Sequence, residues 1–337
     1  MAGRPLSSFW QGRRVLVTGH TGFKGGWLTL WLHRLGARVT GFSGPPPGDP
    51  SLFALARVGE LCEDRRGDVC DPDAVSAAVA AARPEIVFHL AAQPIVRVAV
   101  ADPEATYATN VTGTEHVLAA ARDAAIVCVT SDKCYVPGEA PHREGDRLGG
   151  NDPYSASKAA QERVAAAARE TQGVRVATAR AGNVIGGGDW GRERLVPDLV
   201  RARDSGAAVV LRHPDAVRPW QHVLDPLAGY LLLAERLAES PDWAAPWNFG
   251  PDDAETVRWI VDRVRSHWPL DVRVEPPDDG IEAPALRLDA SKAREQLGWE
   301  PRLDLAAGLD ATVFWHDSVR DGADPRTVTF TQIEELS

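Results

Sequence analysis

The fold is decided by the stretch Arg14-Val15-Leu16-Val17-Thr18-Gly19-His20-Thr21-Gly22-Phe23-Lys24-Gly25. Residues 14–18 are an apolar, β-branched run of the length of a buried strand, and three glycines follow with the spacing G-x-x-G-x-x-G. Residues 26–35 predict a helix that ends at Gly36, and residues 37–42 predict a second strand. Alone, these glycines would suit any turn between a strand and a helix. Flanked in this way they favour a dinucleotide site, because glycine lets the backbone approach a pyrophosphate that the helix N-terminus then binds.

Strands and helices continue to alternate along the first half of the chain. Strands are predicted over residues 84–90, 124–130 and 174–180, and helices over residues 74–82, 103–122 and 153–171. This alternation predicts an α/β Rossmann fold with a doubly wound parallel sheet. After residue 183 the rhythm loosens, with helices expected over residues 194–204, 224–238 and 304–316, one more from residue 255, and a polar tail. We therefore expect a dinucleotide-binding domain over residues 13–182 and a smaller substrate-binding lobe over residues 183–335, with the chain interleaved between them.

Composition and charge argue against several classes of protein. Of the 337 residues, 44% are hydrophobic and 25% are charged, as is typical of a globular protein. A net charge of -10 without a dense Lys/Arg block argues against nucleic acid or an anionic membrane as the main partner. The four cysteines show neither a C-x-x-C pair nor zinc-ligand spacing, so we expect no metal site. Residues 1–11 lack a signal-peptide core and no apolar run approaches the ~20 residues of a membrane span, so we expect a cytoplasmic protein.

The segment Tyr154-Ser155-Ala156-Ser157-Lys158 lies in the helix predicted over residues 153–171. Its tyrosine and lysine are four residues apart and share one face of that helix. A lysine ammonium beside a phenol favours the phenolate, so we expect Lys158 to lower the pKa of Tyr154 and make it a general base. Such a pair is also common on ordinary exposed helices. After a nucleotide-binding turn it resembles the extended short-chain dehydrogenase/reductase family, in which this pair acts on a sugar hydroxyl beside NAD or NADP.

The segment Thr130-Ser131-Asp132-Lys133-Cys134-Tyr135 directly follows the strand predicted over residues 124–130. A carboxylic acid there can protonate a departing hydroxyl, and an amine can move or orient a second proton. In isolation a capped turn with a surface ion pair is the commoner interpretation. The segment resembles the Thr/Ser-Asp-Glu/Lys motif of the nucleotide-sugar 4,6-dehydratases, and its Lys-Cys-Tyr form is similar to the branch that acts on CDP-glucose. Sugar 4-epimerases of the same superfamily typically lack the acid, so Asp132 is the discriminating residue.

The resemblance runs over nearly the whole chain and implies a set of site residues. The residues implied at the catalytic centre are Ser131, Asp132, Lys133, Tyr154 and Lys158. Those implied to bind NAD are Gly19, Thr21, Gly22, Phe23, Lys24, Gly25, Asp68, Val69, Leu90, Ala91, Ala92, Tyr154 and Lys158. Those implied to bind the nucleotide sugar, with CDP-glucose favoured, are Gln93, Asn183, Arg192, Leu195, Arg218, Trp220 and His222. The resemblance also implies a homodimer formed through the helices at residues 103–122 and 153–171.

The reaction that the resemblance implies has three internal steps. Tyr154, assisted by Lys158 and Ser131, removes the proton of the sugar C4 hydroxyl while NAD takes the C4 hydride. Water then leaves from C6, with Asp132 as the acid and Lys133 acting at C5, and the hydride returns to C6. The alternatives are an epimerase or decarboxylase on the same scaffold, a dehydratase for another nucleotide base, and a binding protein that has lost turnover.

Three details bear on specificity. The second strand ends at Gly41-Phe42-Ser43-Gly44, with neither a carboxylate for ribose hydroxyls nor an arginine immediately after it, so NAD is favoured through the resemblance and NADP stays open. Ala99-Val100 stand where the family usually has Ser-Tyr, in a segment that approaches the sugar, so the exact hexose also stays open. His89, at the end of a predicted strand, is expected to be a core histidine rather than a ligand.

Overall fold

The computed structural model describes residues 7–251, 253–275 and 286–336. Its centre is a seven-stranded sheet with the strand order β11-β6-β5-β4-β1-β2-β3, in which every pair of neighbours is parallel. Its strands are β1 (Arg14–Thr18), β2 (Arg38–Ser43), β3 (Glu63–Arg66), β4 (Ile86–His89), β5 (Ala125–Val129), β6 (Val176–Ala181) and β11 (Pro246–Phe249). The chain leaves β1 toward β2 on one side and returns to β4 on the other, so the expected doubly wound sheet is confirmed and its switch point lies beside the glycine turn.

Helices cover both faces of the sheet because alternate residues of each strand point to opposite faces. Val15 and Val17 pack into one core with α2 (Phe23–Arg34) and α10 (Leu224–Glu239). Leu16 packs into a second core on the other face. The helices of that face are α4 (Pro72–Ala82), α7 (Gly113–Ala120) and α8 (Pro153–Gln172).

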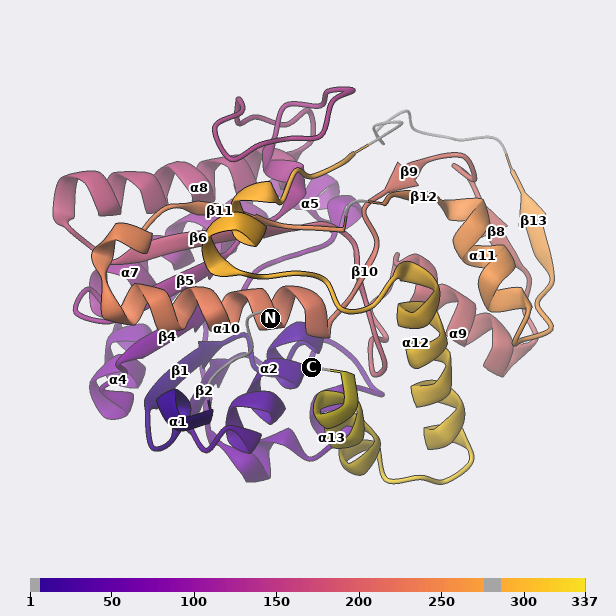
Figure 1. Ribbon diagram of the computed structural model, residues 1–337, viewed down its shortest axis with the longest axis horizontal. Coiled ribbons are helices and arrows are strands. Elements are labelled where there is room, and N and C mark those ends of the chain that lie inside the picture. The colour runs from indigo at the N-terminus through magenta and orange to yellow at the C-terminus, as the bar shows by residue number, and fades with distance from the viewer. Residues whose placement is uncertain (1–6, 252, 276–285, 337) are drawn as a thin grey trace.

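The smaller lobe lies at one end of the molecule, on the right of Figure 1. It has a core of its own, formed mainly by α9 (Leu195–Ser205), β8 (Val209–Leu211), α11 (Val257–Arg265), β13 (Val272–Val274) and α12 (Leu305–Arg320). Strand β11 and helix α10 also come from residues 183–335, but β11 belongs to the seven-stranded sheet and α10 packs against that sheet. Residues 252 and 276–285 of the expected lobe lie outside the described residues, and its boundaries stay a prediction.

Two predicted segments differ from the structure. The expected polar tail is instead helix α13 (Pro325–Leu336). Its buried residues Val328, Thr329, Gln332 and Ile333 form two pairs spaced four apart on one face, and Val328 and Ile333 enter the core that contains α2. The helix expected over residues 103–122 is divided into α6 (Pro103–Tyr107), a π-helical stretch (Ala108–Thr112) and α7, and it is preceded by a further helix, α5 (Val96–Ala101).

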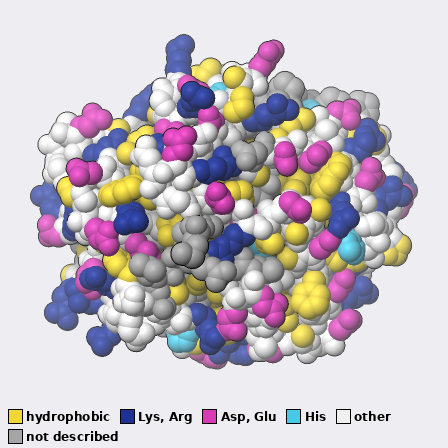
Figure 2. Space-filling model, viewed as in Figure 1, with side chains coloured by type: hydrophobic (Ala, Val, Ile, Leu, Met, Phe, Trp, Pro, Cys, Tyr) yellow, Lys and Arg dark blue, Asp and Glu magenta, His cyan; other side chains and the backbone are white. Residues whose placement is uncertain are grey.

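The remaining elements are short connections. They are α1 (Ser7–Trp10), α3 (Leu52–Leu55), η1 (Val58–Leu61), η3 (Asp132–Cys134), β7 (Val184–Ile185), β9 (Val217–Arg218), β10 (Gln221–His222), η4 (Pro241–Trp243), β12 (Glu255–Thr256) and η5 (Ala293–Leu297). None of the helices in the described ranges is long and apolar enough to span a membrane. On the face drawn in Figure 2, basic and acidic side chains are interspersed, so charge does not segregate by sign there.

Candidate active site

A cavity of about 1170 Å³ opens at the carboxyl end of the sheet, between the sheet and the smaller lobe. The loops that follow β1, β2, β4, β5 and β6 all contribute to its walls. Open α/β sheets bind ligands at this edge, where the strand order reverses. The cavity brings together every residue that the sequence predicts for cofactor binding and for catalysis.

The glycine turn fits a dinucleotide by its backbone. Gly19 has a φ of +78°, and a Cβ there would lie 2.7 Å from the backbone nitrogen of Ala91. A Cβ at Gly25 would lie 2.1 Å from the carbonyl oxygen of Gly19. Gly22 is the N-cap of α2 and has no side chain to satisfy the first amides of that helix. Free amides at a helix N-terminus bind phosphate, so this turn suits the pyrophosphate of NAD.

The second group of residues follows β5 in a single turn of 3₁₀ helix, η3. Ser131 caps this turn by accepting a hydrogen bond of 3.1 Å from the Lys133 amide, and its hydroxyl donates to Asp132 Oδ1 at 2.9 Å. Asp132 is only 3% exposed, and its Oδ2 has no hydrogen-bond partner among the described residues. Burial raises the pKa of Asp132, against the opposing effects of Ser131, Lys133 and Arg218. Burial therefore lets this carboxyl group keep its proton to a higher pH than an exposed aspartate does, and the protonated form can act as an acid.

Tyr154 and Lys158 come from the first turns of α8, which Asp152 caps through the Ser155 amide. Both side chains are buried and line the cavity. Burial raises the pKa of Tyr154 to about 12, although a hydrogen bond with Ser131 opposes the rise. The expected lowering of this pKa is therefore wrong, because burial of the phenol outweighs the two groups that favour the phenolate, Ser131 and Arg194. Lys158 instead donates a hydrogen bond of 2.8 Å to Gln161 Oε1.

Lys158 is itself affected by its surroundings. Burial lowers the pKa of Lys158 to about 8, against the raising effect of nearby acidic groups that include Glu162. His89 lies beneath the site, bonded to Thr18 and Thr114, and burial lowers its pKa to about 3. The expectation of a core histidine is therefore confirmed.

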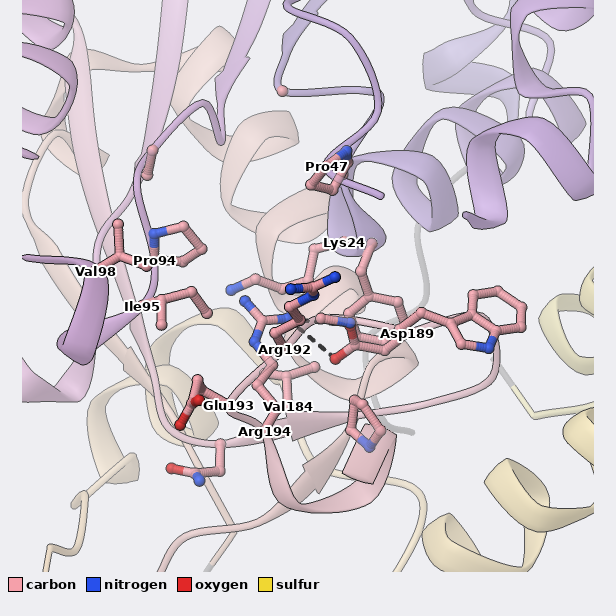
Figure 3. Close-up of a pocket in the computed structure, with 18 of the residues that line it drawn as sticks. Lys24, Pro47, Pro94, Ile95, Val98, Val184, Asp189, Arg192, Glu193 and Arg194 are labelled. Atoms are coloured by element: carbon pink, nitrogen blue, oxygen red, sulfur yellow. Dashed lines mark hydrogen bonds and ion pairs between the residues drawn. The ribbon is translucent and has the colours of Figure 1, made fainter. Parts of the chain in front are cut away.

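Most of the residues expected to bind the sugar nucleotide line the far side of the cavity. These are Asn183, Arg192, Leu195, Arg218 and Trp220. Trp220 is 6% exposed, and its indole N–H has no hydrogen-bond partner among the described residues. Figure 3 shows Arg192 and Arg194 extending from the loop before α9 toward Lys24.

Two expected substrate residues do not line the cavity. Gln93 uses its side chain internally, donating to Thr106 Oγ1 at 2.9 Å and accepting from the Ile95 amide at 2.6 Å. His222 is 1% exposed and packs edge-on against Trp27, and burial lowers its pKa to about 3. Both side chains therefore lie behind the residues that line the cavity and do not face it.

Sequence reasoning did not find Arg194 and Arg66, which also line the cavity. Arg194 donates to Asp189 Oδ2 at 3.0 Å, as Figure 3 shows. It is two residues from the predicted Arg192, but an irregular loop has no periodicity that tells which arginine points inward. Arg66 is the last residue of β3 and reaches the cavity beside the loop that follows β2. Among the described residues, no group of acidic, histidine and cysteine side chains gathers as a metal site would require.

Comparison with known proteins assigns the chain to a family. The model of the family described as "NAD dependent epimerase/dehydratase family" matches residues 15–246. The chain belongs to this family. A CDP-glucose 4,6-dehydratase of Salmonella typhimurium is 46% identical over 94% of this chain and 94% of its own length. A dTDP-glucose 4,6-dehydratase of Streptomyces griseus is 30% identical over 92% of this chain and 96% of its own length.

Solved structures of the epimerase/dehydratase family share the fold. A dTDP-glucose 4,6-dehydratase of Streptomyces venezuelae, solved with NAD bound, has a TM-score of 0.79 at 26% identity and covers 93% of this chain and 99% of its own. A UDP-glucose 4-epimerase of Stenotrophomonas maltophila has a TM-score of 0.82 at 22% identity and covers 92% of this chain and 100% of its own. Because epimerases and dehydratases share the scaffold, the reaction must be argued from the side chains of the site.

Proposed function

We propose that the chain is an NAD-dependent nucleotide-sugar 4,6-dehydratase, a hydro-lyase that converts CDP-glucose to CDP-4-keto-6-deoxyglucose. The observation that carries the proposal is Asp132, a buried carboxyl group with a raised pKa in the same cavity as Tyr154 and the glycine turn. An elimination of water needs such an acid, whereas an epimerisation at C4 does not. The 46% identity to a CDP-glucose 4,6-dehydratase supports both the reaction and the nucleotide.

Tyr154 is the base that takes the proton of the C4 hydroxyl in this proposal. NAD bound at the glycine turn supplies the acceptor for the C4 hydride and its later return to C6. Burial raises the pKa of Tyr154 to about 12, so the phenol is protonated at neutral pH before it acts. It must therefore pass its proton on before or during catalysis, and the hydrogen bond with Ser131 is the contact that favours the phenolate.

Asp132 is the acid that protonates the departing C6 oxygen. Its Oδ1 is bonded to Ser131, which leaves Oδ2 as the oxygen without a partner among the described residues. We assign Lys133, which is half-buried in the same turn, to C5, where its amino group takes the proton or orients a water that does. Arg192 and Arg218 are assigned to the diphosphate, because a guanidinium donates two hydrogen bonds to one phosphate.

One experiment tests the reaction and the nucleotide together. The purified protein is incubated with NAD and with CDP-, dTDP-, UDP- or GDP-glucose, and the sugar nucleotides are weighed by mass spectrometry. The expected product is lighter than CDP-glucose by one water. A product of unchanged mass would indicate an epimerase, loss of carbon dioxide from a uronic acid substrate would indicate a decarboxylase, and water loss only from another nucleotide would move the proposal to that base. No reaction with any of them would overturn it.

We also propose that the enzyme is a cytoplasmic homodimer, formed through α6, α7 and α8. Val100 and Tyr107 are large apolar side chains exposed by 47% and 39% on α5 and α6, and a second copy would cover them. All four cysteines are free, as in a reducing compartment. Sedimentation equilibrium tests the dimer, and Val100→Glu combined with Tyr107→Glu is expected to yield monomers.

A further inference from the structure

The adenosine end of the cavity differs from a usual NAD site. Dinucleotide-binding folds that take NAD place Asp or Glu after the second strand, where it binds the ribose hydroxyls, whereas an arginine nearby accommodates the 2′-phosphate of NADP. Here β2 ends at Ser43, and the loop that follows lines the cavity with glycines, prolines and Ser51, while its one carboxylate, Asp49, does not line it. No carboxylate from the end of β2 therefore lies where it would repel a 2′-phosphate.

Arg66 lies directly beside this position. Residues Ser43 and Arg66 are paired in the register of β2 and β3, and both line the cavity. The Arg66 guanidinium donates from Nη1 to the carbonyl oxygen of Gly44 at 3.0 Å and from Nη2 to Asp64 Oδ2 at 2.8 Å. It also lies over the ring of Phe53, 4.6 Å from the centroid. These contacts fix the plane of the guanidinium, while 41% of the side chain stays exposed.

Two hydroxyl groups stand next to the same carbonyl. Thr21 Oγ1 and Ser43 Oγ are 2.8 Å apart, and Thr21 Oγ1 also donates to the Gly44 oxygen at 3.3 Å. Because Thr21 gives its one proton to Gly44, Ser43 donates to Thr21. The donors for a phosphate monoester are therefore the remaining N–H groups of the fixed Arg66 guanidinium and the Ser43 hydroxyl once it turns from Thr21 to the phosphate.

The Asp64 carboxylate does not prevent Arg66 from binding a phosphate. It does not line the cavity, and its Oδ1 is bonded to the Nε2 of His20 at 2.9 Å. Burial lowers the pKa of His20, so that histidine is neutral and Arg66 is the positive partner of Asp64. Because the local charge is balanced, phosphate binding here depends on directed hydrogen bonds more than on net charge.

We infer that Arg66, Ser43 and Thr21 form a binding site for the 2′-phosphate of NADP, so that this cavity accepts NADP as well as NAD. The inference rests on the dinucleotide cavity of the proposed function but not on the reaction. The 2′-phosphate can be isolated by comparing adenosine 2′,5′-bisphosphate with adenosine 5′-monophosphate, which differ in that group alone. Isothermal titration calorimetry on the full chain measures both, together with NAD and NADP.

The native chain is expected to bind the bisphosphate at least about tenfold more tightly than the monophosphate, and NADP within about tenfold of NAD. Arg66→Ala is expected to remove the preference for the bisphosphate and to leave the monophosphate and NAD within about twofold. Arg66→Lys keeps the positive charge but not the planar guanidinium that donates two hydrogen bonds, so it should retain only part of the preference for the bisphosphate. Arg65→Ala is the matched control, because Arg65 is the preceding residue of β3 and is ion-paired to Glu63.

The inference is overturned if the native chain binds the bisphosphate no better than the monophosphate. It is also overturned if Arg66→Ala weakens both to the same extent, which would be a general loss of the pocket, or if Arg65→Ala gives the same change. None of these measurements uses a sugar nucleotide, so they hold whether or not the chain removes water from CDP-glucose.

Discussion

The two ends of the cavity recognise their ligands by different means. At the cofactor end, the turn at residues 19–25 presents backbone amides, and its glycines leave no room for a Cβ. At the reaction end, Ser131, Asp132 and Tyr154 present side chains that are 8%, 3% and 7% exposed. Recognition at the cofactor end depends on the shape of the backbone. Recognition at the reaction end depends on which buried side chains hold a proton.

This difference separates what a sequence can show from what it cannot. A shape built from glycines is visible as spacing, so the turn at residues 19–25 indicates a dinucleotide once its flanking strand and helix are taken with it. A protonation state depends on burial and on neighbours distant in the chain, as for Asp132 and Tyr154. Substitutions at the two ends should therefore fail in different ways: at the reaction end turnover is lost while binding remains, and at the cofactor end binding is lost first.

The largest effect is expected for Tyr154→Phe. Removing the phenol oxygen takes away the base at C4, so water loss should slow by about 10⁴-fold, the upper range for general acid–base catalysis. Calorimetric binding of NAD should change by less than about twofold, because the ring is retained. Tyr107→Phe, at an exposed tyrosine on α6, is the control and should be as active as the native chain. A Tyr154→Phe enzyme with near-native turnover would mean that the base lies elsewhere.

Asp132→Asn is expected to slow water loss by about 10²-fold, since an amide cannot donate the proton that the C6 oxygen requires. The C4 oxidation precedes that step and should continue. Mass spectrometry should therefore detect a sugar nucleotide that has lost two hydrogens but has kept its water. If oxidation and water loss slow to the same extent, Asp132 acts before the elimination and is not its acid.

Much of the fold could be predicted from local pattern: the buried strands and their alternation with helices are confirmed. Asn183, Trp220 and His222 have no such pattern and were implied by the family resemblance; the first two line the cavity. His222 does not, because strand alternation is interrupted between β9 and β10: the Trp220 amide bonds to the Arg218 oxygen at 3.0 Å, so the side-chain direction restarts there. The pKa of Tyr154 was also wrong, because the packing that buries its phenol comes from several segments and has no local signal.

Gly25→Ala tests the cofactor end. The new Cβ would lie 2.1 Å from the carbonyl oxygen of Gly19, so the turn must move by an amount that costs about 1–3 kcal/mol. NAD affinity should fall by about 10- to 200-fold, and saturating NAD should restore much of the turnover. Gly48→Ala is the control, because it also lines the cavity but has no atom within 4 Å of a new Cβ. Equal losses in the two variants would show that the close approach at Gly25 is not what matters.

The smallest effect concerns the free energy of unfolding, which the buried carboxyl group of Asp132 lowers at neutral pH. Burial raises the pKa of Asp132 above its ordinary value of 3.8, so the folded chain keeps this proton to a higher pH than the unfolded chain. The free energy of unfolding therefore falls as pH rises through the window between the two pKa values, and stays lower above it. Asp132→Asn cannot ionise, so its thermal midpoint should be higher than that of the native chain at neutral pH, and the difference should shrink as the pH falls through 4. A thermal midpoint lower than native at neutral pH would show that the ionised carboxylate stabilises the fold through Lys133 and Arg218. In that case the charged groups of the reaction end would stabilise the fold instead of destabilising it.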